Sequence, residues 1–134
     1  MTPRHVTIGA GSTLGGADAV ISDAVCFGDL VLCSGRAPVD PATLQVLGDT
    51  FDAQAARVVA DVEAVLAAAG SGLDLVLRVE CFLAQASDFP AWNRIWRERF
   101  APPRPARTTV VTGFAVPGIL IELQVTAAVR RDAP

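Results

Sequence analysis

Residues 118–129, GILIELQVTAAV, constrain the fold most because their side chains alternate between apolar and polar types. Odd positions are apolar throughout, whereas Glu122, Gln124 and Thr126 occupy even positions. This period of two predicts a strand with one face in the core. The same period in residues 75–83 predicts another strand, with Arg78 and Glu80 among its even positions.

Two other segments have the period of a helix. In residues 51–69, apolar side chains recur at three- and four-residue steps, and Gly70 is the expected stop. Residues 87–100 predict a second helix, which Ser87 or Asp88 can cap. We expect its apolar stripe to consist of Phe89, Trp92, Ile95, Trp96 and Phe100.

The segment AVCFGDLVLCSG predicts a hairpin around a two-residue Gly28-Asp29 turn of type II′. That turn pairs Cys26 with Val31 and leaves Cys26 and Cys33 as diagonal neighbours, roughly 7–8 Å apart. A relaxed disulfide does not span that distance. We therefore expect free thiols.

The predicted order of elements is ββαβαββ, with one further N-terminal strand possible, in a single domain over residues 1–134. Two helices cover only one face of such a sheet. Arg78, Glu80, Glu122 and Gln124 share the other face with apolar neighbours. A mixed face on so apolar a domain predicts contact between subunits.

Composition argues against several functions. The net charge of −3 disfavours a large nucleic-acid surface. We therefore assign the arginines of the second predicted helix to its solvent-exposed face. His5 is the single histidine, which leaves no ligand spacing for a metal and no credible Ser-His-Asp triad. No apolar leader or membrane-length run is present, so we expect a cytoplasmic protein.

Three features are candidates for chemistry. Arg107 opens a β-rich stretch in PARTTV, either as a solvated strand-end cation or as a receptor for a carboxylate. Glu122 stands alone in an apolar strand, as half of an interface salt bridge or as a carboxylate in a pocket. Ser34, followed by Gly35, either caps a strand end or presents its hydroxyl to a ligand.

The segments AVCFGDLVLCSGRAPVDPAT, LVLRVECFLAQASDFPAWNRIWRERF and PPRPARTTVVTGFAVPGILIELQVTAAV follow in this order. With them the chain resembles the RidA/YjgF/UK114 family of enamine/imine deaminases from about Ser22 to Arg131. The P-x-R-[ST] motif, followed later by I-E, is the most specific mark of the resemblance. It implies an α+β, chorismate-mutase-like fold with two helices on one sheet face, assembled as a homotrimer with pockets between subunits.

The resemblance also implies roles for individual residues. Arg107 would grip the carboxylate of a 2-imino or 2-enamino acid, and Glu122 would help to hold the attacking water. Ser34, Gly35 and Asn93 would line the pocket. The implied activity is that of a 2-iminobutanoate/2-iminopropanoate deaminase-like hydrolase, which needs no cofactor and no metal.

Two positions differ from the pattern common in this family. Ile21 stands where active members commonly have tyrosine, and Thr109 stands where cysteine is frequent. Isoleucine cannot donate the hydrogen bond of tyrosine. The difference motivates two alternatives: a specialised pathway enzyme that acts on another imine or carbonyl intermediate, and a non-catalytic trimeric module that binds small molecules or proteins.

Overall fold

The computed structural model describes residues 1–8 and 20–132. The Gly-rich segment 10–20, which the sequence predicts to be a loop, lies outside them except for Val20. The described elements are β1 (Arg4–Val6), β2 (Ala24–Phe27), β3 (Leu30–Cys33), α1 (Phe51–Ala68), the 3-10 helix η1 (Leu73–Leu75), β4 (Val76–Leu83), the 3-10 helix η2 (Ala86–Asp88), α2 (Phe89–Arg99), β5 (Ala106–Val111) and β6 (Ile121–Ala128). The predicted order is confirmed, and β1 is the further N-terminal strand.

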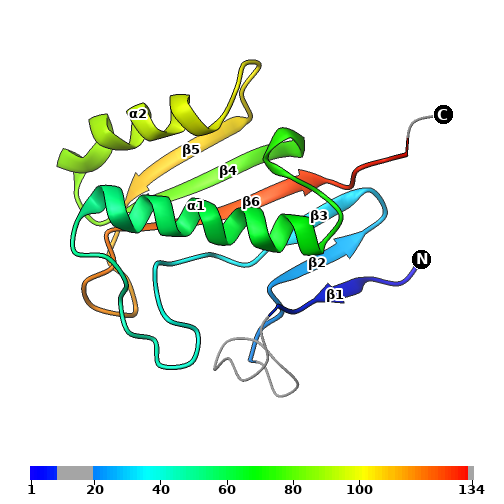
Figure 1. The fold of residues 1–134 in the computed structure, drawn as a ribbon, viewed down its shortest axis with the longest axis horizontal. Helices are drawn as coiled ribbons and strands as arrows, with labels where there is room; N and C mark the ends of the chain where they lie inside the picture. Colours follow the sequence, from blue (N-terminus) through cyan, green and yellow to red (C-terminus); the bar gives the residue numbers. More distant parts are fainter. Residues whose placement is uncertain (9–19, 133–134) are drawn as a thin grey trace.

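The six strands form one sheet in the order β1-β2-β3-β6-β4-β5. Among the described strands only β4 and β5 pair in parallel, and α2 provides the crossover between them. Both helices lie over the same face of the sheet (Figure 1). The sheet is mixed, and with two helices on one face it has the α+β architecture that the family resemblance implies.

The hairpin has the predicted register, with Cys26 opposite Val31. Gly28 has a φ of 59°, and Asp29 keeps a negative φ, as a type II′ turn requires. Cys26, Cys33 and Cys81 are free and buried. Burial raises the pKa of the Cys33 thiol to about 11.

Helix α1 begins and ends where the sequence predicts. The Thr50 hydroxyl accepts a hydrogen bond from the Ala53 N–H at 3.1 Å, and Gly70 follows the helix with a φ of 80°. The predicted cap of α2 is wrong. Asp88 occupies the N-cap position without a side-chain cap bond, and the Ser87 hydroxyl instead donates to the Gln85 side chain.

The alternation predicted for residues 75–83 fails at Leu77. A register shift lies between Val76 and Arg78, so β4 bulges there and the side chain of Leu77 is 48% exposed. Beyond the bulge the pattern holds. Val79 and Cys81 are buried beneath the helices, while Glu80 lies opposite Gln124 on the uncovered face.

We call the sheet face that the helices leave uncovered the open face. The predicted polar residues Arg78, Glu80, Glu122 and Gln124 lie on it. Apolar side chains on this face are also exposed, which is unusual for a monomer of this size. The exposed ones in the sheet register are Phe27, Leu30, Leu32 and Val110.

Candidate functional site

Arg107 lies on the helix-covered face of the sheet. It stands opposite Val79 in the parallel β4–β5 pair, and its side chain reaches α2. Its Nη2 donates to the Asn93 side-chain oxygen at 2.8 Å. The guanidinium carbon also lies 5.0 Å from the ring centroid of Trp96 and 5.6 Å from that of Phe89. An amide and two aromatic rings therefore hold the guanidinium in one orientation.

Phe89 was predicted to belong to the apolar stripe of α2, and this is wrong. Its ring is 41% exposed and packs under Arg107, whereas Trp92, Ile95, Trp96 and Phe100 are buried as predicted. The ring of Phe89, in the first turn of α2, therefore contacts Arg107 and is not buried in the hydrophobic core.

Arg107 Nη1 is buried without a hydrogen-bond partner in the described part of the chain. Thr109 Oγ1 and Trp92 Nε1 are also buried, and both side chains face the thiol of Cys81. Buried polar groups are normally paired, and each exception calls for an explanation. Burial raises the pKa of the neighbouring Cys81 thiol, and Trp92, Thr109 and Arg107 oppose that rise. The unpaired Nη1 is a donor of the kind that a carboxylate accepts.

Glu122 lies on the open face. It stands opposite Phe82 in the β4–β6 pair, and its carboxylate lies against the backbone of Gly35. A Cβ added at Gly35 would stand 2.5 Å from Glu122 Oε2, so only glycine permits this approach. Desolvation by burial raises the pKa of the Glu122 carboxyl.

Glu122, Gly35 and Ile21 line one cavity of about 470 Å³. Among the described residues, Ser34 is not part of the cavity lining. Its hydroxyl donates to the Ser22 carbonyl oxygen at 2.7 Å, as expected of a serine that secures a strand end. Of the predicted Ser34-Gly35 pair, Gly35 thus borders the cavity, whereas Ser34 holds the adjacent backbone through its bond to Ser22.

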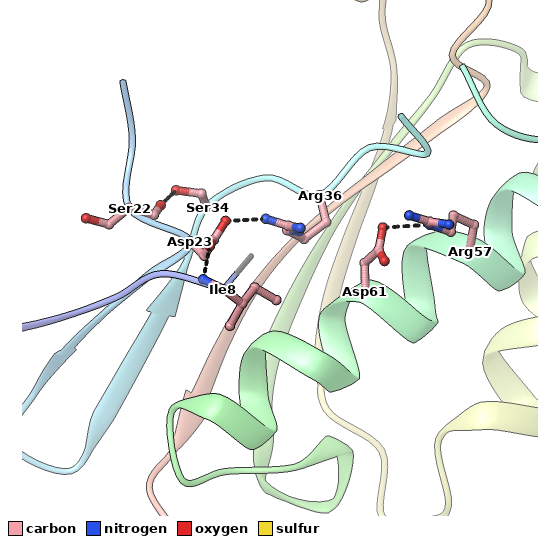
Figure 2. A network of polar contacts seen from close by, with 7 residues as sticks. All are labelled: Ile8, Ser22, Asp23, Ser34, Arg36, Arg57 and Asp61. Carbon is pink, nitrogen blue, oxygen red and sulfur yellow. Dashed lines mark hydrogen bonds and ion pairs between the residues drawn. The ribbon is translucent and has the colours of Figure 1, made fainter. Parts of the chain in front are cut away.

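Two ion pairs also border the cavity, and neither was predicted from the sequence. Arg36 Nη1 lies 2.7 Å from Asp23 Oδ1, and the other oxygen of Asp23 accepts the Ile8 N–H. Arg57 and Asp61 pair along α1 at 3.2 Å. Both pairs border the same space (Figure 2). Asp23 is almost completely buried. Its place directly before an apolar strand is the sequence feature from which a buried, paired carboxylate could have been predicted.

The predicted site residues therefore form two half-sites. Arg107, Asn93 and Thr109 gather on the helix-covered face, whereas Glu122 and Gly35 gather on the open face with Ile21 in the same cavity. Paired residues of neighbouring strands point to one face, so the register places Arg107 and Glu122 on opposite faces. One chain does not bring these two side chains together.

Two exposed arginines of α2 pair with carboxylates, whereas Arg97 has no ion pair among the described residues. Arg94 lies 2.7 Å from Asp52 and 3.6 Å from Glu98, and Arg99 pairs with Glu63. A nucleic-acid surface needs cations that are free to meet phosphates. Among the described residues of α2, Arg97 is the one arginine without an ion pair, which is too few cations for such a surface.

The family model Endoribonuclease L-PSP matches residues 16–129. A RutC family protein from Saccharolobus solfataricus is 38% identical over 79% of this chain and 84% of its own. The protein HMF1 from Saccharomyces cerevisiae is 33% identical over 85% of this chain and 88% of its own.

Solved structures agree with this match. A YjgF-family protein from Neisseria meningitidis has a TM-score of 0.82 at 28% identity, covering 98% of both chains. RidA from Psychrobacter has a TM-score of 0.80 at 28% identity, covering 94% of this chain and all of its own. This chain therefore has the fold of the YjgF-type proteins. It belongs to the Endoribonuclease L-PSP family, which confirms the RidA/YjgF/UK114 resemblance.

No helix within residues 1–8 and 20–132 is long and apolar enough to cross a membrane. No group of three or more histidine, cysteine, aspartate or glutamate side chains that could hold a metal ion occurs in these ranges either.

Proposed function

We propose that this protein hydrolyses reactive 2-imino and 2-enamino acids to 2-keto acids and ammonia without a cofactor. The observation that carries the proposal is Arg107, whose guanidinium is oriented by Asn93 and two aromatic rings and keeps Nη1 without a partner in the described chain. Such a group suits the planar carboxylate of an amino-acid-like substrate. Glu122, a carboxylate without an ion-pair partner in the described ranges, supplies a base.

The reaction needs positioning and proton transfer. Glu122 accepts a proton from water while the water oxygen bonds to the carbon of the protonated imine, and the C=N electron pair moves to nitrogen, which gives a neutral carbinolamine. The same proton passes from Glu122 to the nitrogen, the C–N bond breaks with its electron pair on nitrogen, and ammonia leaves. The hydroxyl proton passes to the Glu122 carboxylate as the carbonyl forms. An enamine first takes a proton on carbon, which gives the same protonated imine. Acid-base assistance of this kind typically contributes about 10²–10⁴-fold.

The proposal requires more than one copy of the chain, because Arg107 and Glu122 lie on opposite faces of the sheet. We propose a homotrimer in which the Arg107 half-site of one copy meets the Glu122 half-site of the next. The exposed apolar residues of the open face support this assembly, since Phe27, Leu30 and Leu32 would otherwise remain in water.

The assembly is testable by light scattering on a size-exclusion column. We expect about three times the 14.0 kDa chain mass. Leu32→Glu places a charge on the open face and is expected to lower that mass, because an unpaired charge is costly in an interface. As a control, Ala64→Glu on the exposed side of α1 should leave the mass unchanged. A monomeric wild-type protein at micromolar concentration would contradict the shared site.

The activity is testable with imino acids generated in place by an amino-acid oxidase, with semicarbazone formation as the readout. Semicarbazide traps the imine, so a deaminase lowers the yield of semicarbazone. We expect the purified protein to lower it in proportion to its concentration. If the protein has no effect on any imino acid but binds 2-keto acids at the site, the result would instead favour a non-catalytic binding module. That is the alternative motivated by isoleucine at position 21 in place of tyrosine.

A further inference from the structure

The segment between β3 and α1 forms a compact loop over residues 38–47. Asp40 organises it, because its carboxylate accepts the N–H groups of Ala42 and Thr43 at 2.8 and 3.1 Å. Its backbone exchanges bonds with Leu44 and Gln45 at 2.7 and 2.8 Å. Val39 and Val46 close the loop as a two-residue bridge. The loop is therefore held by its own hydrogen bonds.

Leu44 has an unfavourable backbone conformation in this loop. Its φ of 63° is the only positive value among the non-glycine residues of the described chain. L-residues with a branched side chain avoid this region, and glycine or asparagine adopts it most readily. An observed outlier of this kind is a reason to look for a function of the side chain.

Leu44 lines the same cavity as Glu122. Ile21, Val39, Val116 and Ile119 make most of the remaining wall apolar. The cations Arg36 and Arg57 are each paired with an acid, whereas Glu122 has no ion-pair partner in the parts of the chain described. Among the described residues of one chain, the cavity therefore offers an apolar wall and no unpaired cation beside the proposed base.

We propose that this cavity receives the substrate side chain, that it selects 2-imino acids with branched or aromatic apolar side chains, and that Leu44 is a specificity-determining residue. This inference rests on the proposed function, since Glu122 is the base in both. A volume of about 470 Å³ lies within the usual range of ligand pockets, roughly 300–1,000 Å³, and leaves most of its space to a group beyond the imine. An acidic side chain would meet Glu122 without a free cation to balance it.

The first arm of the test compares kcat/KM for imines made from leucine, phenylalanine, alanine and aspartate. We expect the leucine and phenylalanine imines to exceed the alanine imine by about tenfold or more, because each methylene in an apolar pocket contributes measurably. Leu44→Gly and Leu44→Ala should each reduce that ratio by about tenfold. Leu47→Ala shortens a leucine of the same loop outside the cavity lining and should keep the wild-type ratio.

The two Leu44 variants separate the side chain from the backbone. Leu44→Gly relieves the left-handed strain and should melt at a higher temperature than Leu44→Ala, which keeps it. If only one of the two loses the preference, the backbone rather than the isobutyl group determines it, and the assignment of Leu44 is wrong.

The second arm measures calorimetric binding of pyruvate, 4-methyl-2-oxopentanoate and phenylpyruvate, which share the carboxylate and side chain of the imines. Tighter binding of the two larger keto acids, dependent on Leu44, would keep the cavity assignment even if no imine is hydrolysed, and the deamination proposal alone would fail. Hydrolysis of all imines at rates within about twofold would overturn the cavity assignment alone. Neither hydrolysis nor keto-acid binding would overturn both.

Discussion

Replacing Arg107 with alanine or with lysine is expected to remove most of the imine-hydrolysing activity while the protein stays folded and trimeric. The loss of a charge-assisted hydrogen bond costs roughly 1.5–3 kcal/mol, which corresponds to about ten- to over a hundredfold in kcat/KM. Lysine should not restore the rate, because it offers a point charge where arginine offers two donors in a plane.

The surroundings of Arg107 give this prediction its physical basis. Asn93 and the rings of Phe89 and Trp96 orient a planar guanidinium, and an ammonium group would lose these contacts. Arg130→Lys is the matched control, because Arg130 is exposed and paired with Asp74 away from both half-sites. Near-full turnover by Arg107→Lys would show that the two-donor grip is wrong. Retained activity in Arg107→Ala would show that Arg107 has no role in catalysis and is only a strand-end cation.

Glu122→Gln is expected to lower kcat by about 10²–10⁴-fold, because glutamine holds a water but cannot take its proton. In the wild-type protein, activity should fall towards acid pH with a midpoint above 4.5, the ordinary pKa of this side chain, because burial raises the pKa of Glu122. Glu98→Gln, on the exposed side of α2, is the control and should keep the wild-type rate. A rate in Glu122→Gln close to that of the control would remove Glu122 from the mechanism.

The same substitution should also change stability, with a sign that follows from the raised pKa. The folded protein binds the Glu122 proton more tightly than the unfolded chain does. This stabilisation is complete below the unfolded pKa and is lost as the pH rises through the folded pKa. Glutamine stays neutral, so Glu122→Gln should melt at a higher temperature than wild type at neutral pH. The difference should shrink towards acid pH, and a variant that melts lower at neutral pH would contradict the desolvation of this carboxyl.

The sequence predicts the sheet, both helices and the hairpin register because these depend on short-range periodicity and turn chemistry. The details it misses depend on tertiary contacts. Phe89 has helical spacing yet packs under Arg107, and the bulge after Val76 moves Leu77 out of the core. The left-handed Leu44 has no sequence signal, since glycine is the residue that such a position favours.

For the candidate site, the sequence points to Arg107 and Glu122 as separate residues but not to their relation in space. That relation depends on the register across three strands, which pairs Arg107 with Val79 and Glu122 with Phe82. Adjacent side chains along β4 point to opposite faces, so the two half-sites diverge within one chain. A shared site between copies is the arrangement that this geometry favours.

Complementation tests this sharing most directly. Chains carrying Arg107→Ala and chains carrying Glu122→Gln would be co-expressed with different tags, and trimers containing both would be purified by the two tags in succession. If each site combines Arg107 of one copy with Glu122 of the next, about a third of the sites keep both side chains, because every trimer that contains both chain types has one such site. We therefore predict activity on the order of a third of the wild-type rate, far above that of either variant alone. Activity no higher than that of the two variants measured separately would contradict a site shared between subunits.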